Sequence, residues 1–147
     1  MVDYDDPEFE AQWLAERRDE VASYLEREGV VYGKIGEVPA WHIAPYVSIW
    51  AVENQENPSL IVAWAISGDL PNDYVSASSA RNQREAMHAI ASLWEEAAQY
   101  MARGERHPTF VIGTGENAEE LAPMLASRAE MLLEWAGDPE IWEENEL

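Results

Sequence analysis

Apolar residues near the start of the chain recur at intervals of three and four, with charged residues between them. Asp6 and Pro7 are typical of the N-cap and the first helical position, and Gly29 is typical of the residue that follows a helix. We therefore predict a helix over about residues 7–28. Its apolar face consists of Phe9, Trp13, Leu14, Val21, Tyr24 and Leu25.

A second helical pattern begins after the middle of the chain. Asn82 and Glu85 have the spacing of a capping box, in which two side chains satisfy free N–H groups of the first turn. Gly104 is a suitable end for this helix. The pattern predicts a helix over about 83–103. Its apolar face consists of Ala86, Ile90, Leu93, Trp94, Ala97 and Met101.

A third helix is predicted over about 118–136, because Asn117 and Glu120 repeat the capping box. Pro123 cannot donate a backbone hydrogen bond, so we expect it to kink this helix or to delay its start. Residues 138–140 repeat the opening signature of the first helix and indicate a short final helix.

Between the first two helices the pattern changes to that of strands. Residues 41–53 and 59–67 are dense in Val, Ile and Trp, and a turn-forming cluster at 54–58 separates them. This predicts a β-hairpin. Both faces of each run are apolar, so we expect both faces of the sheet to be at least partly covered. Pro45 lacks a donor, which favours an edge position or a bulge.

The remaining segments are short. Two glycines and a proline fall within 33–39, and glycine, proline, Asn and Asp gather at 68–74, so we predict loops in both segments. Residues 30–32 and 109–112 are candidates for additional short strands. The elements together predict an α+β fold, in which an antiparallel sheet built on the central hairpin carries the three main helices. We expect one domain over 1–147, with the acidic ends 1–8 and 138–147 as candidates for mobile segments.

Composition limits the class of protein further. Of the 147 residues, 47% are hydrophobic and seven are tryptophans, enough apolar surface for a folded core. The chain has no cysteine, so it offers neither a disulfide nor a thiolate. The N-terminus is acidic where a signal peptide is basic, and the longest apolar run is far shorter than a membrane span. We expect a cytoplasmic protein without a membrane segment.

The formal net charge of −20 argues against binding to nucleic acid, whose phosphates attract Lys and Arg. Residues 1–28 carry ten acids against three arginines, and residues 116–147 carry ten against one. One interpretation is an acidic surface that captures a basic protein. The other is solubility or adaptation to high internal salt. The sequence leaves both interpretations open.

One group of residues could carry acid–base chemistry. If residues paired across the hairpin have numbers that sum to about 111, His42 lies beside Asp69, which could orient the imidazole. Asp73 and Tyr74 lie in the same predicted loop, where Tyr74 and nearby serines offer hydroxyl groups. No Gly-x-Ser-x-Gly elbow is present. The alternative is structural: Asp69 caps a turn and His42 donates one hydrogen bond.

We expect no metal and no cofactor. The three histidines, His42, His88 and His107, fall on different predicted elements and outside any ligand pair. Residues 113–115 (GTG) lack the lysine of a phosphate loop, and the acids that follow would repel an anion. Among the tryptophans, Trp41, Trp50 and Trp142 are not assigned to a helical core face. We therefore take them, with Asp69 and Asp73, as candidate binding residues.

Three blocks of the chain carry a resemblance, at 39–46 (PAWHIAPY), 67–76 (SGDLPNDYVS) and 84–87 (REAM). Through them the chain resembles a bacterial family described only as a domain of unknown function. The resemblance spans most of the chain and implies a small, acidic, intracellular bacterial protein. It implies no activity and assigns no catalytic residue.

Two functions remain as hypotheses. The first is a non-catalytic protein that engages a basic protein partner, in its sharpest form an immunity- or antitoxin-like inhibitor. The alternative is a small hydrolase centred on the loop 68–79 with His42. The oligomeric state is left open.

Overall fold

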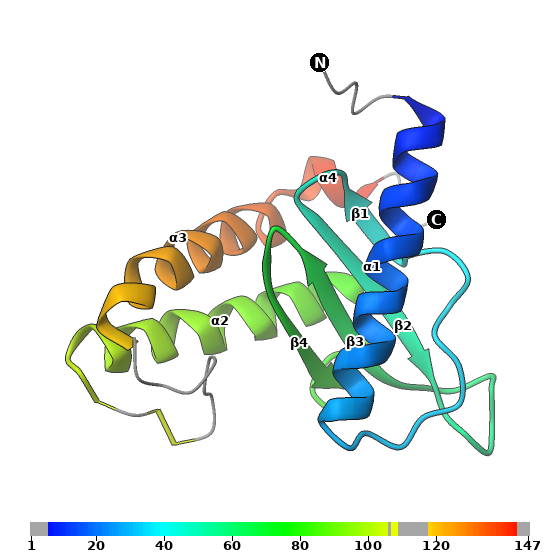
Figure 1. The fold of residues 1–147 in the computed structure, drawn as a ribbon, viewed down its shortest axis with the longest axis horizontal. Coiled ribbons are helices and arrows are strands. Elements are labelled where there is room, and N and C mark those ends of the chain that lie inside the picture. The colour runs from blue at the N-terminus through cyan, green and yellow to red at the C-terminus, as the bar shows by residue number, and fades with distance from the viewer. Residues whose placement is uncertain (1–5, 106, 109–117, 144–147) are drawn as a thin grey trace. The chain divides into compact units, whose positions relative to one another are not determined.

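A computed structural model of the chain describes residues 6–105, 107–108 and 118–143. Within these residues, four antiparallel strands form one sheet and three helices are long, which confirms the predicted α+β class. The elements in chain order are α1 (Pro7–Arg27), β1 (Trp41–Ile43), β2 (Val47–Glu53), β3 (Ile61–Gly68), β4 (Leu70–Ser76), α2 (Gln83–Ala102), α3 (Ala118–Ala136) and α4 (Pro139–Glu143) (Figure 1).

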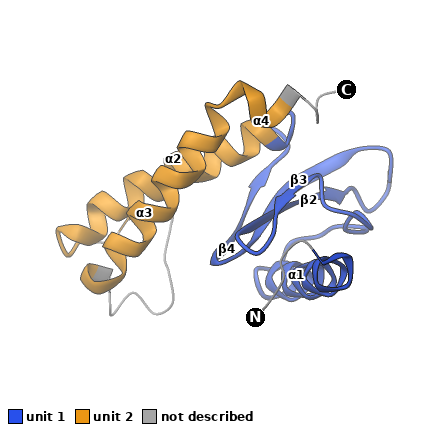
Figure 2. Ribbon diagram, turned by 90° about the horizontal axis from the view of Figure 1, so that it is seen from above, with its two compact units in different colours: residues 1–83 blue, residues 84–147 orange. Residues whose placement is uncertain are grey.

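The chain divides into two compact units, residues 1–83 and 84–147 (Figure 2). The first unit contains α1 and the sheet. The second contains α3, α4 and almost all of α2. Whether the two units form one domain over 1–147 depends on how they pack together, so the single domain stays a prediction. Part of each acidic end is helical, since α1 begins at Pro7 and α4 begins at Pro139.

Helix α1 begins and ends where its sequence signals predict. The Asp6 carboxylate accepts a hydrogen bond of 2.9 Å from the backbone N–H of Glu8, which satisfies one free donor of the first turn. Gly29, just beyond the helix, has a φ of 72°, a conformation that favours glycine. The predicted apolar face is confirmed, with Trp13, Val21 and Leu25 buried and Phe9, Leu14 and Tyr24 partly buried.

The strands follow one another in the order β1-β2-β3-β4. Helix α1 packs on one face of the sheet, where Val21 and Leu25 join the buried residues Ile35, Trp50, Val52, Ala63 and Ala65. The residues that alternate with these on β2 and β3 are buried as well: Val47, Ile49, Trp64 and Ile66. Both sets of alternating residues are therefore buried, as the apolar character of both faces of each run predicts.

The first predicted strand is broken in two, contrary to the prediction of one run over 41–53. The chain reverses at 44–46, where the Ala44–Pro45 peptide bond is cis and the Tyr46 N–H donates to the Ile43 carbonyl over 2.8 Å. β1 therefore folds back on β2. In the next hairpin Trp50 pairs with Ala65, so paired numbers sum to 115 and the assumed sum of 111 is wrong.

The loop predicted over 68–74 is also wrong in part, because Leu70–Ser76 forms strand β4 at the edge of the sheet. An edge strand is paired on one side only, and it tolerates Pro71 and other residues that are rare in strands. Gly68 permits the tight connection from β3. A Cβ there would lie 2.2 Å from the Tyr46 carbonyl oxygen, and its φ is +154°.

Two other candidate strands have different outcomes. Residues 30–32 are not part of a strand, although Ile35 beyond them forms an isolated bridge with Val52. The candidate strand at 109–112 lies outside the described residues. No helix in the described parts of the chain combines the length and the apolar character needed to cross a membrane.

In the second unit, α2 and α3 lie side by side (Figures 1 and 2). Both match the predicted bounds within a residue, and α3 continues through Pro123 without a delayed start. Buried residues of α3 recur at alternating intervals of three and four, the seam of a coiled-coil pair; they are Ala122, Leu125, Ala129, Leu132 and Ala136. The predicted short final helix is confirmed as α4.

Candidate functional site

His42 pairs with an acid other than the one the sequence suggested. The strand register places His42 opposite Ser48 on β2. Its Nε2 lies 2.6 Å from Oε1 of Glu10 on α1, and both side chains are partly exposed, 28% and 40%. The predicted pairing of His42 with Asp69 assumed that paired residue numbers sum to 111. The observed sum is 115, so the register gives no reason to place the two side chains together. The contact ties the start of α1 to the edge strand β1.

Asp69 and Asp73 belong to other contacts. Asp69 is exposed in the turn from β3 to β4, and its backbone N–H donates to the Tyr46 carbonyl over 2.9 Å. Asp73 is 8% exposed, and its Oδ1 accepts a hydrogen bond of 2.8 Å from the Tyr74 N–H. The Tyr24 hydroxyl, 3.5 Å away, donates to the same oxygen.

This second cluster joins α1 to the edge strand β4. The Tyr24 and Tyr74 rings meet edge to face with centroids 6.2 Å apart. Burial raises the pKa of the Tyr24 hydroxyl, and the nearby Asp73 carboxylate raises it further. A phenol held protonated beside a carboxylate is a stable hydrogen bond donor, which suits a packing contact. Asp73 and Tyr74 therefore lie together, in a different set of contacts from His42.

The His42–Glu10 pair has part of the geometry of a catalytic base. A carboxylate orients the imidazole in many hydrolases. Nucleophilic catalysis also needs a hydroxyl or thiol at the other ring nitrogen. Among the contacts of the described residues, His42 has no hydroxyl partner. The pair as it stands positions α1 against β1.

The three candidate tryptophans are core residues. Trp41, Trp50 and Trp142 are 4%, 1% and 0% exposed. The Trp50 indole donates to Ser48 Oγ over 2.8 Å, and the Trp142 indole donates to the Trp135 carbonyl over 2.9 Å. The expectation that they could anchor a partner at the surface is wrong, because their rings are enclosed and these two indoles have partners within the fold.

No metal centre is evident in the part of the chain that the structure describes, where no three His, Asp or Glu side chains are grouped to hold an ion.

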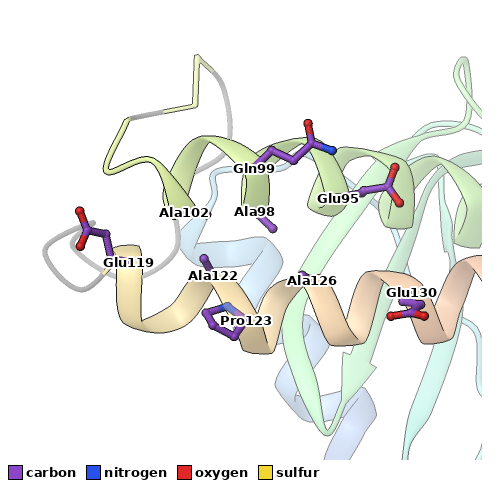
Figure 3. Close-up of a pocket in the computed structure, with 9 residues that line it drawn as sticks. All are labelled: Glu95, Ala98, Gln99, Ala102, Glu119, Ala122, Pro123, Ala126 and Glu130. Atoms are coloured by element: carbon purple, nitrogen blue, oxygen red, sulfur yellow. The ribbon is translucent and has the colours of Figure 1, made fainter.

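The helical unit contains a groove that the sequence reasoning missed. It runs between α2 and α3 and has a volume of about 630 Å³ (Figure 3). Four of its residues come from α2 and five from α3. The α2 wall consists of Glu95, Ala98, Gln99 and Ala102, and the α3 wall consists of Glu119, Ala122, Pro123, Ala126 and Glu130.

The residue spacing explains why the groove forms. On α2 the lining residues are separated by three, one and three positions, which is one helical face, and those on α3 follow the same rule. Where the two faces meet, the side chains are mainly alanine. Ala98 and Ala122 are buried at 4% and 3% exposure, whereas Ala102, Pro123 and Ala126 remain exposed. Small side chains leave the space between the helices unfilled.

Carboxylates mark both ends of this groove. Glu119 lies at one end, and Glu95 and Glu130 lie toward the other (Figure 3). All three side chains are exposed, and none of the described contacts pairs them with a cation. Arg103, which follows the last residue of α2, forms an ion pair with Glu105, with 3.1 Å between its Nη2 and Oε2 of the glutamate. The unit that holds the groove carries fourteen acids against four arginines. A cation entering the groove would therefore meet carboxylates that have no ion-pair partner among the described residues.

A sequence signal for this groove did exist. Ala98 and Ala102 are one turn apart on α2, as are Ala122 and Ala126 on α3, and a glutamate lies one turn beyond each pair. Within Glu95-Glu96 and within Glu119-Glu120 the two side chains point in different directions from the helix, so the sequence of either pair alone indicates no site. The pairing of α2 with α3 was needed to show that one member of each pair flanks a shared groove.

The fold and this site define an α+β protein with a four-stranded meander sheet and a helical unit that carries an acid-flanked groove. The chain belongs to the family described as "Domain of unknown function (DUF4826)", whose model matches residues 8–142. That match confirms the resemblance to a domain of unknown function. No curated protein and no solved structure matches the chain significantly.

Proposed function

We propose that this chain is a non-catalytic binding protein that engages a basic protein partner through the groove between α2 and α3. Its sharpest form is an immunity- or antitoxin-like inhibitor in the cytoplasm of a bacterium. Inhibitors of this kind bind a partner surface and need no reaction chemistry of their own. Association would be accelerated by long-range attraction between a protein of charge −20 and a basic partner.

The observation that carries the proposal is the combination of shape and charge in the groove. Its floor is formed by alanine and proline side chains, and its ends carry Glu95, Glu119 and Glu130. Exposed apolar surface in a concave site, flanked by polar groups, is typical of binding sites. The carboxylates select for a cation because each is exposed and lacks a cationic partner in the described contacts.

Solubility accounts for part of the acidity. The excess of acids is the same in both units, fifteen against five bases in residues 1–83 and fourteen against four in residues 84–147. An even excess is what general solubility or salt adaptation produces. Neither of these purposes requires an apolar groove between two helices, so the groove favours a binding function beyond solubility.

The alternative is a small hydrolase centred on residues 68–79 with His42. The supporting observation is the His42–Glu10 pair at 2.6 Å, which could orient an imidazole base. The other candidates, Asp69, Asp73 and Tyr74, lie in separate contacts, and residues 70–76 form a strand. We therefore favour the binding function.

The proposal is tested by affinity capture with the full chain as bait in a lysate of its own source cells. The salt concentration is raised in steps after washing at low salt. We expect a partner of high isoelectric point that is released as salt screens the charges. A chain that retains no basic protein at low salt contradicts the proposal.

A further inference from the structure

We infer that the groove receives an α-helix of the partner, with cationic side chains about three turns apart on the face that enters the groove. This inference rests on the proposed function and names the shape and chemistry of the partner segment. It follows from the backbone of the groove walls, from the spacing of the carboxylates and from the size of the floor residues.

The walls of the groove favour a helix over an extended segment. Both walls are α-helices, whose interior backbone N–H and C=O groups are already bonded within each helix. An extended peptide lying on alanines would lose water from its own backbone groups without gaining partners. A helix satisfies these groups internally, so it can bury one face in an apolar groove without that loss.

The carboxylates set the spacing of the cations. Glu119 and Glu130 are eleven residues apart on α3, which corresponds to about 16 Å along the helix axis. Eleven residues rotate about the helix axis by three turns and about 20°, so Glu119 and Glu130 lie on the same face of α3. A bound helix running along the groove repeats the same rise. Its cations therefore fit at positions i and i+11. A further cation at i+15 lies one turn beyond, at the end of the groove that carries Glu95 and Glu130.

The floor sets the side chains between the cations. Ala98, Ala102, Ala122 and Ala126 let a third helix approach closely, because the distance between packed helices depends on the side chains at their contact. Leucine or alanine of the partner at i+4 and i+7 would then fill the groove. The partner helix would then pack against both α2 and α3, and its cations would pair with the carboxylates at the two ends of the groove.

The experiment uses synthetic helical peptides and the full chain. The matching peptide has Arg at i, i+11 and i+15 with Ala and Leu between them. An isomer of the same composition has Arg at i, i+9 and i+13, which puts the first Arg on the opposite side from the others. A third peptide has a central proline that prevents the helix. Binding is measured by fluorescence anisotropy at low salt.

We expect the matching peptide to bind about tenfold more tightly than either of the other two. Backbone amide shifts of the full chain should map its contact to α2 and α3. The triple variant Glu95→Gln, Glu119→Gln and Glu130→Gln should lose this preference. The matched control, Glu26→Gln, Glu37→Gln and Glu56→Gln, removes the same charge from exposed positions of the first unit and should keep it.

Each of four results would overturn the inference. Equal binding of the isomer shows that only total charge matters. Equal binding of the proline peptide shows that an extended segment is accepted. Displacement of the matching peptide by an equal concentration of spermine shows a site for small polyamines. If the peptides fail while affinity capture still yields a basic partner, the helix inference is wrong and the proposed function stands.

Discussion

Arg84, in the first turn of α2, donates a hydrogen bond of 2.8 Å from Nε to the carbonyl oxygen of Ala136, the last residue of α3. Carbonyl groups in the last turn of a helix have no partner within the helix and carry partial negative charge. A guanidinium therefore suits this position. The bond links the start of one wall helix to the end of the other, and so fixes the helical pair that forms the groove.

Replacement of Arg84 tests the importance of this link. Arg84→Met keeps much of the apolar stem but removes the donor, and we expect the free energy of unfolding to fall by about 1.5–3 kcal/mol. Urea denaturation followed by circular dichroism measures the change. Arg84→Lys keeps the charge without the planar guanidinium and should lose less. A methionine variant as stable as the parent would show that the bond contributes nothing.

Gly68 is the residue at which a methyl group should be least tolerated. In Gly68→Ala the new Cβ would lie 2.2 Å from the Tyr46 carbonyl oxygen, at a φ of +154°. We expect a loss of at least about 2 kcal/mol in the free energy of unfolding. Gly29→Ala is the control, because Gly29 has a φ of +72° but open space around it. It should cost about 1 kcal/mol. Equal losses would contradict the close approach.

Ser48 links two buried groups. Its Oγ accepts from the Trp50 indole over 2.8 Å and donates to the Ser67 carbonyl over 2.9 Å. Ser48→Ala leaves the indole N–H without this partner, and we expect a cost of about 1–3 kcal/mol in chemical denaturation. The cost should shrink in a Trp50→Phe background, where that N–H is absent. If the cost is the same in both backgrounds, the indole bond is unimportant.

The stability of the fold should depend on pH in the alkaline range. Burial and the Asp73 charge raise the pKa of Tyr24 from its ordinary value of 10.0, so the folded state keeps a proton that the unfolded state releases. The stabilising effect is complete below pH 10 and is lost as the pH rises toward the folded pKa. We expect Tyr24→Phe to flatten the fall in stability above that pH.

Thermal unfolding at several alkaline pH values measures the effect. Tyr46→Phe is the control, because Tyr46 is 48% exposed in the turn between β1 and β2. It should leave the pH dependence unchanged. An alkaline slope that is the same in the parent and in Tyr24→Phe would show that Tyr24 does not titrate with unfolding.

The helices could be predicted from the sequence because their signals are local. Asp6 and Gly29 mark the ends of α1 through contacts within a few residues of the helix. The sheet was less accessible. Because the chain reverses at 44–46, His42 pairs with a residue of β2 and not with the strand after the hairpin turn. Strand β4 forms because β3 offers it a partner. Both depend on pairing between segments, which local propensity does not encode.

The candidate site shows the same limit. Trp41 and Trp50 belong to no helical stripe, so their burial follows from the sheet and its cover rather than from their spacing. The groove depends on which face of α2 meets which face of α3. The alanines and glutamates that form it are visible in the sequence, but their common location becomes apparent only when the two helices are paired.

A comparison of two triple variants in affinity capture tests whether the groove holds the basic partner. One is neutralised at Glu95, Glu119 and Glu130 in the groove, and the other at Glu26, Glu37 and Glu56 in the first unit. Both lose three negative charges and start from a net charge of −20. If the groove holds the basic partner, the groove variant loses that partner at a salt concentration where the control variant retains it. Equal retention by the two variants would contradict binding in the groove.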